Sequence, residues 1–241
     1  MTDIRRLALP LREPLEASKR GAAVVLCNLK GMSNVLPAES PSRDQRSAKL
    51  RSLRLAQRFV LRLLLGACLG RPGKDVQIDT GPHGKPELVY RPGDWPLHFS
   101  LSHSGSWLAI ALAARAPVGI DIEPADRRIE GLRLARRYFH PGEVAALAEL
   151  PKPLRQRCFL RMWTAKEAVI KAQGATLASH LQSVIVSPDQ PPALRAVPAD
   201  WPAADQWTLV GFDDAFGLVM NLAAPVPLEG VDLFDLELPG G

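Results

Sequence analysis

The chain has 241 residues, of which 46% are apolar and 23% charged, so we expect a substantial core in one large domain or two small ones. Its formal net charge of +5 favours an anionic partner only weakly, because nucleic acid, an anionic membrane, a phosphorylated small molecule and an acidic protein would all satisfy it. The three cysteines are scattered and form no CxxC pair, so the sequence indicates neither a disulfide framework nor a zinc knuckle. It shows neither a signal peptide nor a membrane span, and scattered thiols suit a reducing compartment, so we expect a cytoplasmic protein.

The first half of the chain predicts a buried strand, a long helix and two further strands. The apolar run over 22–29 predicts the first strand, and the spacing of apolar residues over 41–69 predicts the helix. A loop rich in glycine and proline follows over 71–96. Residues 98–113 predict two strands that are joined by a polar turn at 102–106.

After a break at 114–117, the second half shows a similar series of elements. We expect a strand, three helices and three more strands, over residues 118–123, 131–139, 140–150, 154–173, 181–187, 207–212 and 217–223. This loose repetition suggests two halves, 1–116 and 117–241, although no repeat is visible in the sequence itself.

Two acidic residues interrupt the otherwise apolar run VGIDIE, residues 118–123. Asp121 and Glu123 are two positions apart, so on a strand they project to one face while Ile120 and Ile122 project to the other. Burying two like charges together is unfavourable unless protons or cations compensate them. Two interpretations stay open: an edge strand whose polar face lies in water, and a site for a divalent metal ion such as Mg²⁺.

The helix expected over 154–173 adds a third carboxylate and a cation. Glu167 lies on the flank of an apolar stripe, and Lys171 follows it by four residues, so the two stack along the helix. Taken alone, they are an ordinary surface pair that contributes little to stability. Together with Asp121 and Glu123, they could serve a metal ion and a phosphate.

Two loops add candidates for anion binding. In SLSHSG, residues 100–105, serines surround His103 where backbone N–H groups could point outward. Lys85 lies in HGKPEL, residues 83–88, in which a glycine would let it reach a ligand. A histidine in a strand turn and a lysine in such a loop are more often simply solvated.

The long helix over 41–69 carries a stripe of arginines opposite its apolar face. The stripe consists of Arg51, Arg54, Arg58 and Arg62. Charge on the outer face of an amphipathic helix is the usual outcome, and nucleic-acid binding is the competing interpretation. The aromatic content of 6% and the lack of a nucleic-acid-binding fingerprint argue against nucleic acid.

Taken in order, these motifs resemble the Sfp-like 4′-phosphopantetheinyl transferases over roughly residues 40–175. The resemblance rests on HGKPEL (83–88), FSLSHS (99–104), VGIDIE (118–123), YFHPGE (138–143) and FLRMWTAKEAVIKAQG (159–174). It implies an α/β (α+β) fold of two similar, pseudo-two-fold-related subdomains, each a small antiparallel-rich sheet packed with helices, with the active site in the cleft between them. One departure is Ser100, where many relatives have asparagine; we expect this residue to support the turn.

The resemblance also implies an activity. Members of the family move the 4′-phosphopantetheine arm of coenzyme A to a serine of an acyl or peptidyl carrier protein and release 3′,5′-ADP, as holo-[acyl-carrier-protein] synthase type enzymes that serve pathways such as secondary metabolite biosynthesis. They require Mg²⁺ and act as monomers, with neither nucleic acid nor a membrane as partner. A relative that is catalytically idle and binds coenzyme A or a carrier protein as a regulator is the alternative, and the presence of all three carboxylates argues against it.

Residue by residue, the resemblance assigns roles at both ends of the proposed substrate. Asp121, Glu123 and Glu167 would hold Mg²⁺, with Glu167 also the general base, and Lys171 would contact the phosphates. The residues implied at the nucleotide are Arg58, Lys85, Ser102 and His103, with Arg43 and Arg46 as weaker candidates for the 3′-phosphate.

Overall fold

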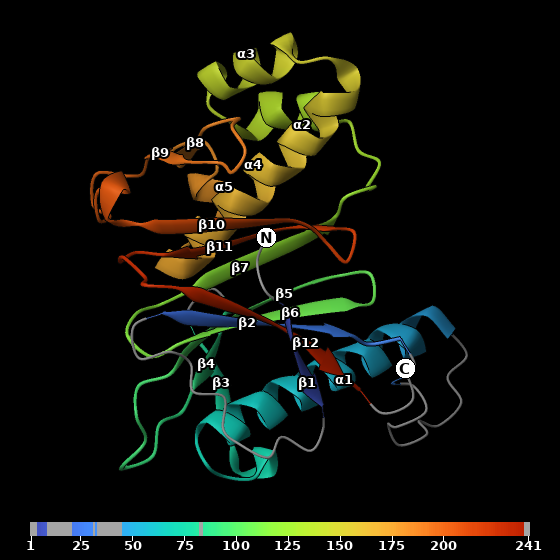
Figure 1. Ribbon diagram of the computed structural model, residues 1–241, viewed down its shortest axis with the longest axis vertical. Coiled ribbons are helices and arrows are strands. Elements are labelled where there is room, and N and C mark those ends of the chain that lie inside the picture. The colour runs from blue at the N-terminus through green and yellow to red at the C-terminus, as the bar shows by residue number, and fades with distance from the viewer. Residues whose placement is uncertain (1–3, 9–20, 31, 33–44, 82–83, 239–241) are drawn as a thin grey trace.

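The computed structural model describes residues 4–8, 21–30, 32, 45–81 and 84–238 of the chain, in two main sheets that lie face to face (Figure 1). The larger sheet has the strand order β1-β12-β2-β6-β5. Its strands are β1 (Ile4–Ala8), β2 (Ala22–Asn28), β5 (His98–Ser104), β6 (Trp107–Ala113) and β12 (Val231–Glu237). β12 runs parallel to both β1 and β2, whereas β2, β6 and β5 are antiparallel neighbours.

The smaller sheet has the order β10-β11-β7 and is antiparallel throughout. Its strands are β7 (Gly119–Pro124), β10 (Thr208–Ala215) and β11 (Leu218–Ala224). The long helix α4 (Lys152–Gln173) covers one face of this sheet (Figure 1). Further helices and short strands surround α4: α2 (Gly131–Tyr138), α3 (Pro141–Glu149), α5 (Leu177–His180), β8 (Ile185–Val186), β9 (Leu194–Ala196) and the 3₁₀ turn Ala204–Gln206.

The outer face of the larger sheet packs on α1 (Gln45–Cys68), whose apolar stripe includes Val60, Leu64 and Leu65. The long α1–β5 connection contains the 3₁₀ turn Gly73–Asp75 and a small hairpin of β3 (Ile78–Thr80) and β4 (Pro86–Leu88). None of the helices in the described part of the chain combines the length and hydropathy that a bilayer crossing requires.

The core between the two sheets follows from strand alternation. Ile120 and Ile122 of β7 point into it, together with alternate residues of β2, β6 and β11. The intervening residues of β7, Asp121 and Glu123, therefore point to the opposite face, towards α4. This alternation is what turns two carboxylates of an otherwise buried strand towards the helix.

The mixed α/β class is confirmed, and several expected elements are observed with shifted ends. The helix expected over 41–69 is α1, of which 41–44 lie outside the described residues. The turn expected at 102–106 is present but shorter, because β5 continues to Ser104 and only residues 105 and 106 join it to β6. The strand expected over 181–187 shrinks to β8 because its first residues form a turn after α5.

Other elements were not predicted at all. These include the edge strand β1, the hairpin β3–β4 within the expected loop over 71–96, the short elements α5 and β9, and β12 near the C-terminus. β12 matters for the division into halves, because it pairs with β2 in the larger sheet although it comes last in the chain. The boundary at 116/117 and the pseudo-two-fold relation stay predictions.

Candidate active site

The site is built where the edge strand β5 of one sheet meets the edge strand β7 of the other. Asp121 and Glu123 lie on the face of β7 that packs against α4. Asp121 is 4% exposed and lies opposite Asn221 of β11 in the antiparallel register. A carboxylate this deeply buried requires compensation by hydrogen bonds or by a cation.

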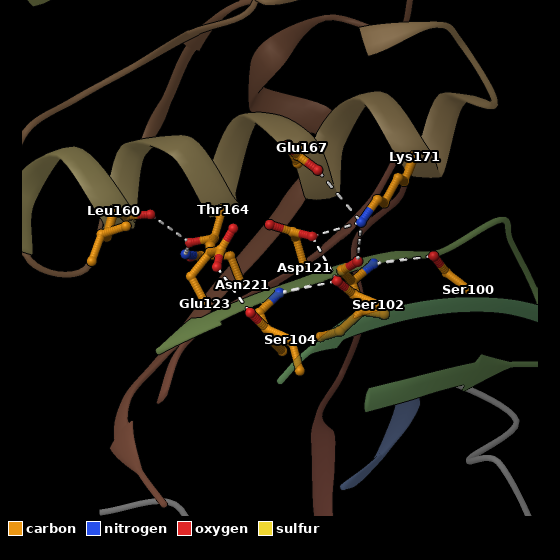
Figure 2. Close-up of polar contacts among 12 residues, drawn as sticks. Ser100, Ser102, Ser104, Asp121, Glu123, Leu160, Thr164, Glu167, Lys171 and Asn221 are labelled. Atoms are coloured by element: carbon orange, nitrogen blue, oxygen red, sulfur yellow. Dashed lines mark hydrogen bonds and ion pairs between the residues drawn. The ribbon is translucent and has the colours of Figure 1, made fainter. Parts of the chain in front are cut away.

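Helix α4 supplies the compensating cation (Figure 2). The Nζ atom of Lys171 lies 2.6 Å from Asp121 Oδ1 and 3.6 Å from Glu167 Oε2. It also donates a hydrogen bond of 3.3 Å to the carbonyl oxygen of Ile120. One ammonium group thus joins a carboxylate of β7 to a carboxylate of α4, so the structure brings together three of the residues that the sequence singled out.

Three serines of β5 complete the junction between the sheets. Ser100, Ser102 and Ser104 alternate along one face of β5, and their hydroxyl groups reach the free edge of β7 (Figure 2). Ser102 donates to Asp121 Oδ1 at 2.7 Å, and Ser104 donates to Glu123 Oε2 at 3.1 Å.

The hydroxyl groups of Ser100 and Ser102 also accept hydrogen bonds from the β7 backbone. The amide of Ile120 donates to Ser100 Oγ at 3.3 Å, and the amide of Ile122 donates to Ser102 Oγ at 3.4 Å. Backbone amides at a buried strand edge need partners, and the serines provide them. Ser100 therefore lies within a strand and supports β7, and the expectation that it supports a turn was wrong.

Burial and crowding of like charges dominate the electrostatics. Burial, reinforced by the Asp121 carboxylate, raises the pKa of Glu167 to about 7. Burial also raises the pKa of Glu123, although Arg127 and Ser104 act in the opposite direction. Burial lowers the pKa of Lys171, but Asp121 and Glu167 outweigh it and raise the pKa above its ordinary value. Glu123, Glu167 and Lys171 therefore each hold a proton more tightly than the same group does in water.

The carboxylates supply oxygen donors of the kind that a hard divalent cation prefers. Asp121 Oδ2 is buried and has no hydrogen-bond partner among the described residues, which leaves an oxygen free for a ligand. Glu123 Oε1 is paired with the partly exposed Arg127. Among the described residues, no three Asp, Glu, His or Cys side chains are grouped as a metal-binding cluster. Carboxylate oxygens are the type of ligand that Mg²⁺ prefers. In this structure, however, Asp121 and Glu123 are paired with the basic side chains of Lys171 and Arg127.

Lys85 extends the site beyond the C-terminal end of α4. Its Nζ atom donates to the carbonyl oxygen of Lys171 at 2.8 Å, and its pKa is lowered by burial and by the positive charge of Lys171. Two cavities of about 330 and 350 Å³ lie on either side of this contact and share Lys85, Phe99 and Gly174 among their lining residues. Their position next to two lysines suits an anionic ligand with a planar or apolar part.

The remaining nucleotide candidates that the structure describes lie on α1 and on the opposite face of β5. Arg58 is exposed on α1 and lines a third cavity of about 450 Å³, together with Arg54, Arg62 and Gly84. His103 is exposed and lies on the face of β5 opposite Ser102. Arg43 lies outside the described residues, as does the side chain of Arg46.

The sequence analysis missed a buried polar contact that ties α4 to the smaller sheet (Figure 2). Asn221 Nδ2 donates to Thr164 Oγ1 at 2.7 Å, and Thr164 Oγ1 donates to the carbonyl oxygen of Leu160. Both side chains are fully buried. The asparagine in the apolar run LVMNLAA is the signal that could have revealed it, because a buried amide needs a partner.

Comparison with known proteins identifies the family of this chain. A family model described as the 4′-phosphopantetheinyl transferase superfamily matches residues 117–216, which contain all three carboxylates and Lys171. The protein psf-1 of Bacillus pumilus, named a 4′-phosphopantetheinyl transferase, is 30% identical over 183 residues, which are 74% of each chain. The chain therefore belongs to the 4′-phosphopantetheinyl transferase superfamily.

Two cyanobacterial relatives are similar over shorter stretches. A putative 4′-phosphopantetheinyl transferase of Synechocystis sp. is 35% identical over 164 residues, 67% of this chain and 65% of that protein. The 4′-phosphopantetheinyl transferase HetI of Nostoc sp. is 36% identical over 145 residues, 60% of this chain and 61% of that protein. The chain thus covers somewhat less than two thirds of these two relatives.

Proposed function

We propose that the protein transfers the 4′-phosphopantetheine arm of coenzyme A to a serine hydroxyl of an apo acyl or peptidyl carrier protein. The serine oxygen forms a bond to the β-phosphorus, the bond from that phosphorus to the bridging oxygen breaks, and 3′,5′-ADP leaves. The observation that carries the proposal is the convergence of Asp121 and Glu167, from a strand and a distant helix, on the ammonium group of Lys171.

Glu167 is the proposed general base. Its pKa of about 7 lies close to neutral pH, where a base combines a useful deprotonated fraction with adequate basicity. It would take the proton of the carrier serine, directly or through a water molecule. Because phosphoryl transfer depends mainly on positioning and charge neutralisation, the rigid attachment of Glu167 to α4 is as important as its basicity.

Asp121, Glu123 and Glu167 are the proposed ligands of Mg²⁺. When bound, the ion would polarise the pyrophosphate oxygens and neutralise charge that develops on them. Ser102 and Ser104 orient Asp121 and Glu123 for this task through the hydrogen bonds described above. The unpartnered Asp121 Oδ2 supports this assignment.

The proposed nucleotide end of the site lies at Lys85 and the cavities beside it. Lys171 and Lys85 would contact the phosphates, and Arg58 and His103 would act at the 3′-phosphate. Ser102 was proposed at the nucleotide as well, and its hydroxyl would have to turn away from Asp121 to reach it. We further propose that the protein is a cytoplasmic monomer that does not act on nucleic acid or at a membrane.

A transfer assay over a small panel of carrier proteins tests the function. Purified protein, Mg²⁺ and coenzyme A are incubated with apo carriers of fatty-acid and peptide-synthetase type, and each carrier is examined by mass spectrometry. At least one carrier should gain the mass of the arm, and the Asp121→Ala variant should leave it unmodified. Unmodified carriers throughout the panel with the wild-type protein would contradict the proposal.

A further inference from the structure

The ammonium group of Lys171 occupies the point where two of the proposed metal ligands converge. Its oxygen neighbours are Asp121 Oδ1, Glu167 Oε2 and the carbonyl oxygen of Ile120, at 2.6, 3.6 and 3.3 Å. An ammonium group surrounded by oxygens compensates the same negative charges that a divalent cation would. Asp121 and Glu167 are therefore already gathered around a cation in this structure (Figure 2).

The third carboxylate is also paired with a basic side chain. Arg127 forms an ion pair with Glu123 across one turn of chain, four residues apart. The side chains of Lys171 and Arg127 are 25% and 44% exposed, whereas those of Asp121 and Glu123 are only 6% and 12% exposed. The carboxylates are thus less exposed than the two cations that compensate them, and both cations lie at the ends of long, flexible side chains.

We propose that Lys171, together with Arg127, is a built-in counter-ion that holds the carboxylates in the ligand-free protein until a divalent metal ion displaces it. The displaced ammonium group would then be free to contact the coenzyme phosphates. This role depends on the proposed function, in which the same carboxylates hold Mg²⁺. One cation replaces another, so the buried carboxylates are never left uncompensated, a state that proteins tolerate poorly.

The proposal predicts effects of opposite sign when Lys171 is removed. A metal ion that must displace the ammonium group can bind only to the fraction of protein in which the carboxylates are free. Its apparent affinity is the intrinsic affinity multiplied by that fraction. Without Lys171 this competition disappears, so the metal should bind more tightly. Transfer should nevertheless become slower, because the phosphates lose a cation.

Metal binding in the absence of coenzyme A measures the first effect without reference to activity. Lys171→Met keeps most of the stem and removes the charge. Titration with Mn²⁺, an oxygen-seeking ion that substitutes for Mg²⁺, is followed by the electron paramagnetic resonance of free Mn²⁺. We expect about tenfold tighter binding by Lys171→Met than by wild type.

Lys85→Met is the matched control. It removes the same charge close by, but Lys85 Nζ donates to the carbonyl oxygen of Lys171 and not to a carboxylate. A general reduction of positive charge would tighten Mn²⁺ binding in both variants alike. If the metal ion instead displaces the Lys171 ammonium group, Lys85→Met should change the Mn²⁺ affinity by no more than about threefold. This is the effect expected of a charge that acts at a distance through partly screened surroundings.

Thermal unfolding gives an independent measurement. Without metal, Lys171→Met should have a lower Tm than wild type, by about 5 °C, because its carboxylates have lost their counter-ion. Saturating Mn²⁺ should raise the Tm of Lys171→Met more than that of wild type, since a ligand that binds the folded state more tightly stabilises it more.

The outcomes separate the counter-ion role from the proposed function. If the wild type transfers the arm in a Mg²⁺-dependent way but Lys171→Met binds Mn²⁺ no more tightly than wild type or than Lys85→Met, the counter-ion role is wrong and the function stands. If the wild type transfers the arm equally well in excess chelator and binds no Mn²⁺, the metal site and the counter-ion role fail together.

Discussion

Helix α4 carries two lysine–carboxylate pairs five residues apart, and they differ in how completely they are satisfied. Lys166 Nζ lies 2.7 Å from Glu143 Oε2, and the two side chains are 0% and 3% exposed. Lys171 Nζ lies 2.6 Å from Asp121 Oδ1, and these side chains are 25% and 6% exposed. The distances are nearly equal, so distance alone does not distinguish a structural pair from a functional one.

The surroundings of the two pairs do distinguish them. Lys166 also donates to the carbonyl oxygens of Leu181 and Val184. Glu143 in turn accepts hydrogen bonds from the amides at the start of α3 and in β8. Asp121, by contrast, keeps one buried oxygen without a partner. The Lys166–Glu143 pair thus has the complete hydrogen bonding of a structural contact, whereas Asp121 keeps an oxygen that a ligand could bind.

Removing the charge of Lys166 should have the largest effect on stability. Lys166→Met leaves the Glu143 carboxylate buried without its cation, so we expect the free energy of unfolding to fall by about 3–5 kcal/mol. Urea denaturation followed by circular dichroism measures the loss. The folded fraction of Lys166→Met should retain most of the transfer activity of wild type, because Lys166 points away from Asp121 and into the α5–β8 segment.

The double variant Lys166→Met with Glu143→Leu is the control. An apolar pair of similar volume often replaces a buried ion pair with little loss, so the double variant should be more stable than Lys166→Met alone. If the loss of unfolding free energy in the double variant equals the sum of the losses in the two single variants, Lys166 and Glu143 do not stabilise the fold as a pair.

The corresponding change at the other pair should act on transfer instead. Asp121→Asn preserves the shape of the side chain but removes its charge, and we expect the transfer rate to fall by about 10²–10³-fold, as for loss of one preorganised electrostatic group. The Tm should stay within a few degrees of wild type. Transfer at the wild-type rate would remove Asp121 from the site, and a collapse of Tm would make it a structural residue like Glu143.

The charged residues of the candidate site were easier to predict from sequence than the serines that hydrogen-bond to them. Asp121 with Glu123 and Glu167 with Lys171 follow strand and helix periodicity, which fixes the face on which side chains lie. That these two faces meet could come only from the family resemblance, since no local pattern encodes the packing of α4 on β7. The serine contacts were missed because the β5–β6 turn was expected to begin at residue 102, whereas β5 continues to Ser104 and holds the three serines on one face of a strand.

The fold shows the same limit. Long elements with strong periodicity, such as α1 and α4, were predicted within a few residues. β12 alternates only weakly between apolar and acidic residues in VDLFDLE, and its place between β1 and β2 depends on pairing across two hundred residues. Such pairing is decided by tertiary contacts, which a local sequence pattern does not contain.

A smaller effect is expected at the contact that sets α4 against the smaller sheet. Thr164→Val removes the nearer of two acceptors of Asn221 Nδ2, the other being the carbonyl oxygen of Arg161, and keeps the shape of the side chain; it should lower the free energy of unfolding by about 1–3 kcal/mol. A double-mutant cycle with Asn221→Leu measures the coupling. If the contact also positions Glu167, one turn further along α4, the kcat of the variants falls while the KM for coenzyme A is unchanged; a change in neither would confine the contact to stability.

The smallest effect concerns the pH dependence of stability in the metal-free protein. The pKa of Glu167 is raised from 4.5 to about 7 on folding, so the folded state holds this proton more tightly than the unfolded chain. The associated stabilisation is complete below about pH 4.5 and is lost as the pH rises through 7.

Glu167→Gln cannot titrate, so the Tm of wild type should fall by a few degrees relative to this variant between pH 5 and 8. Glu130→Gln, at a side chain that is 75% exposed, provides the baseline. A Tm difference between wild type and Glu167→Gln that stays constant over this range would mean that the carboxyl group has an ordinary pKa, which would also weaken its assignment as the general base.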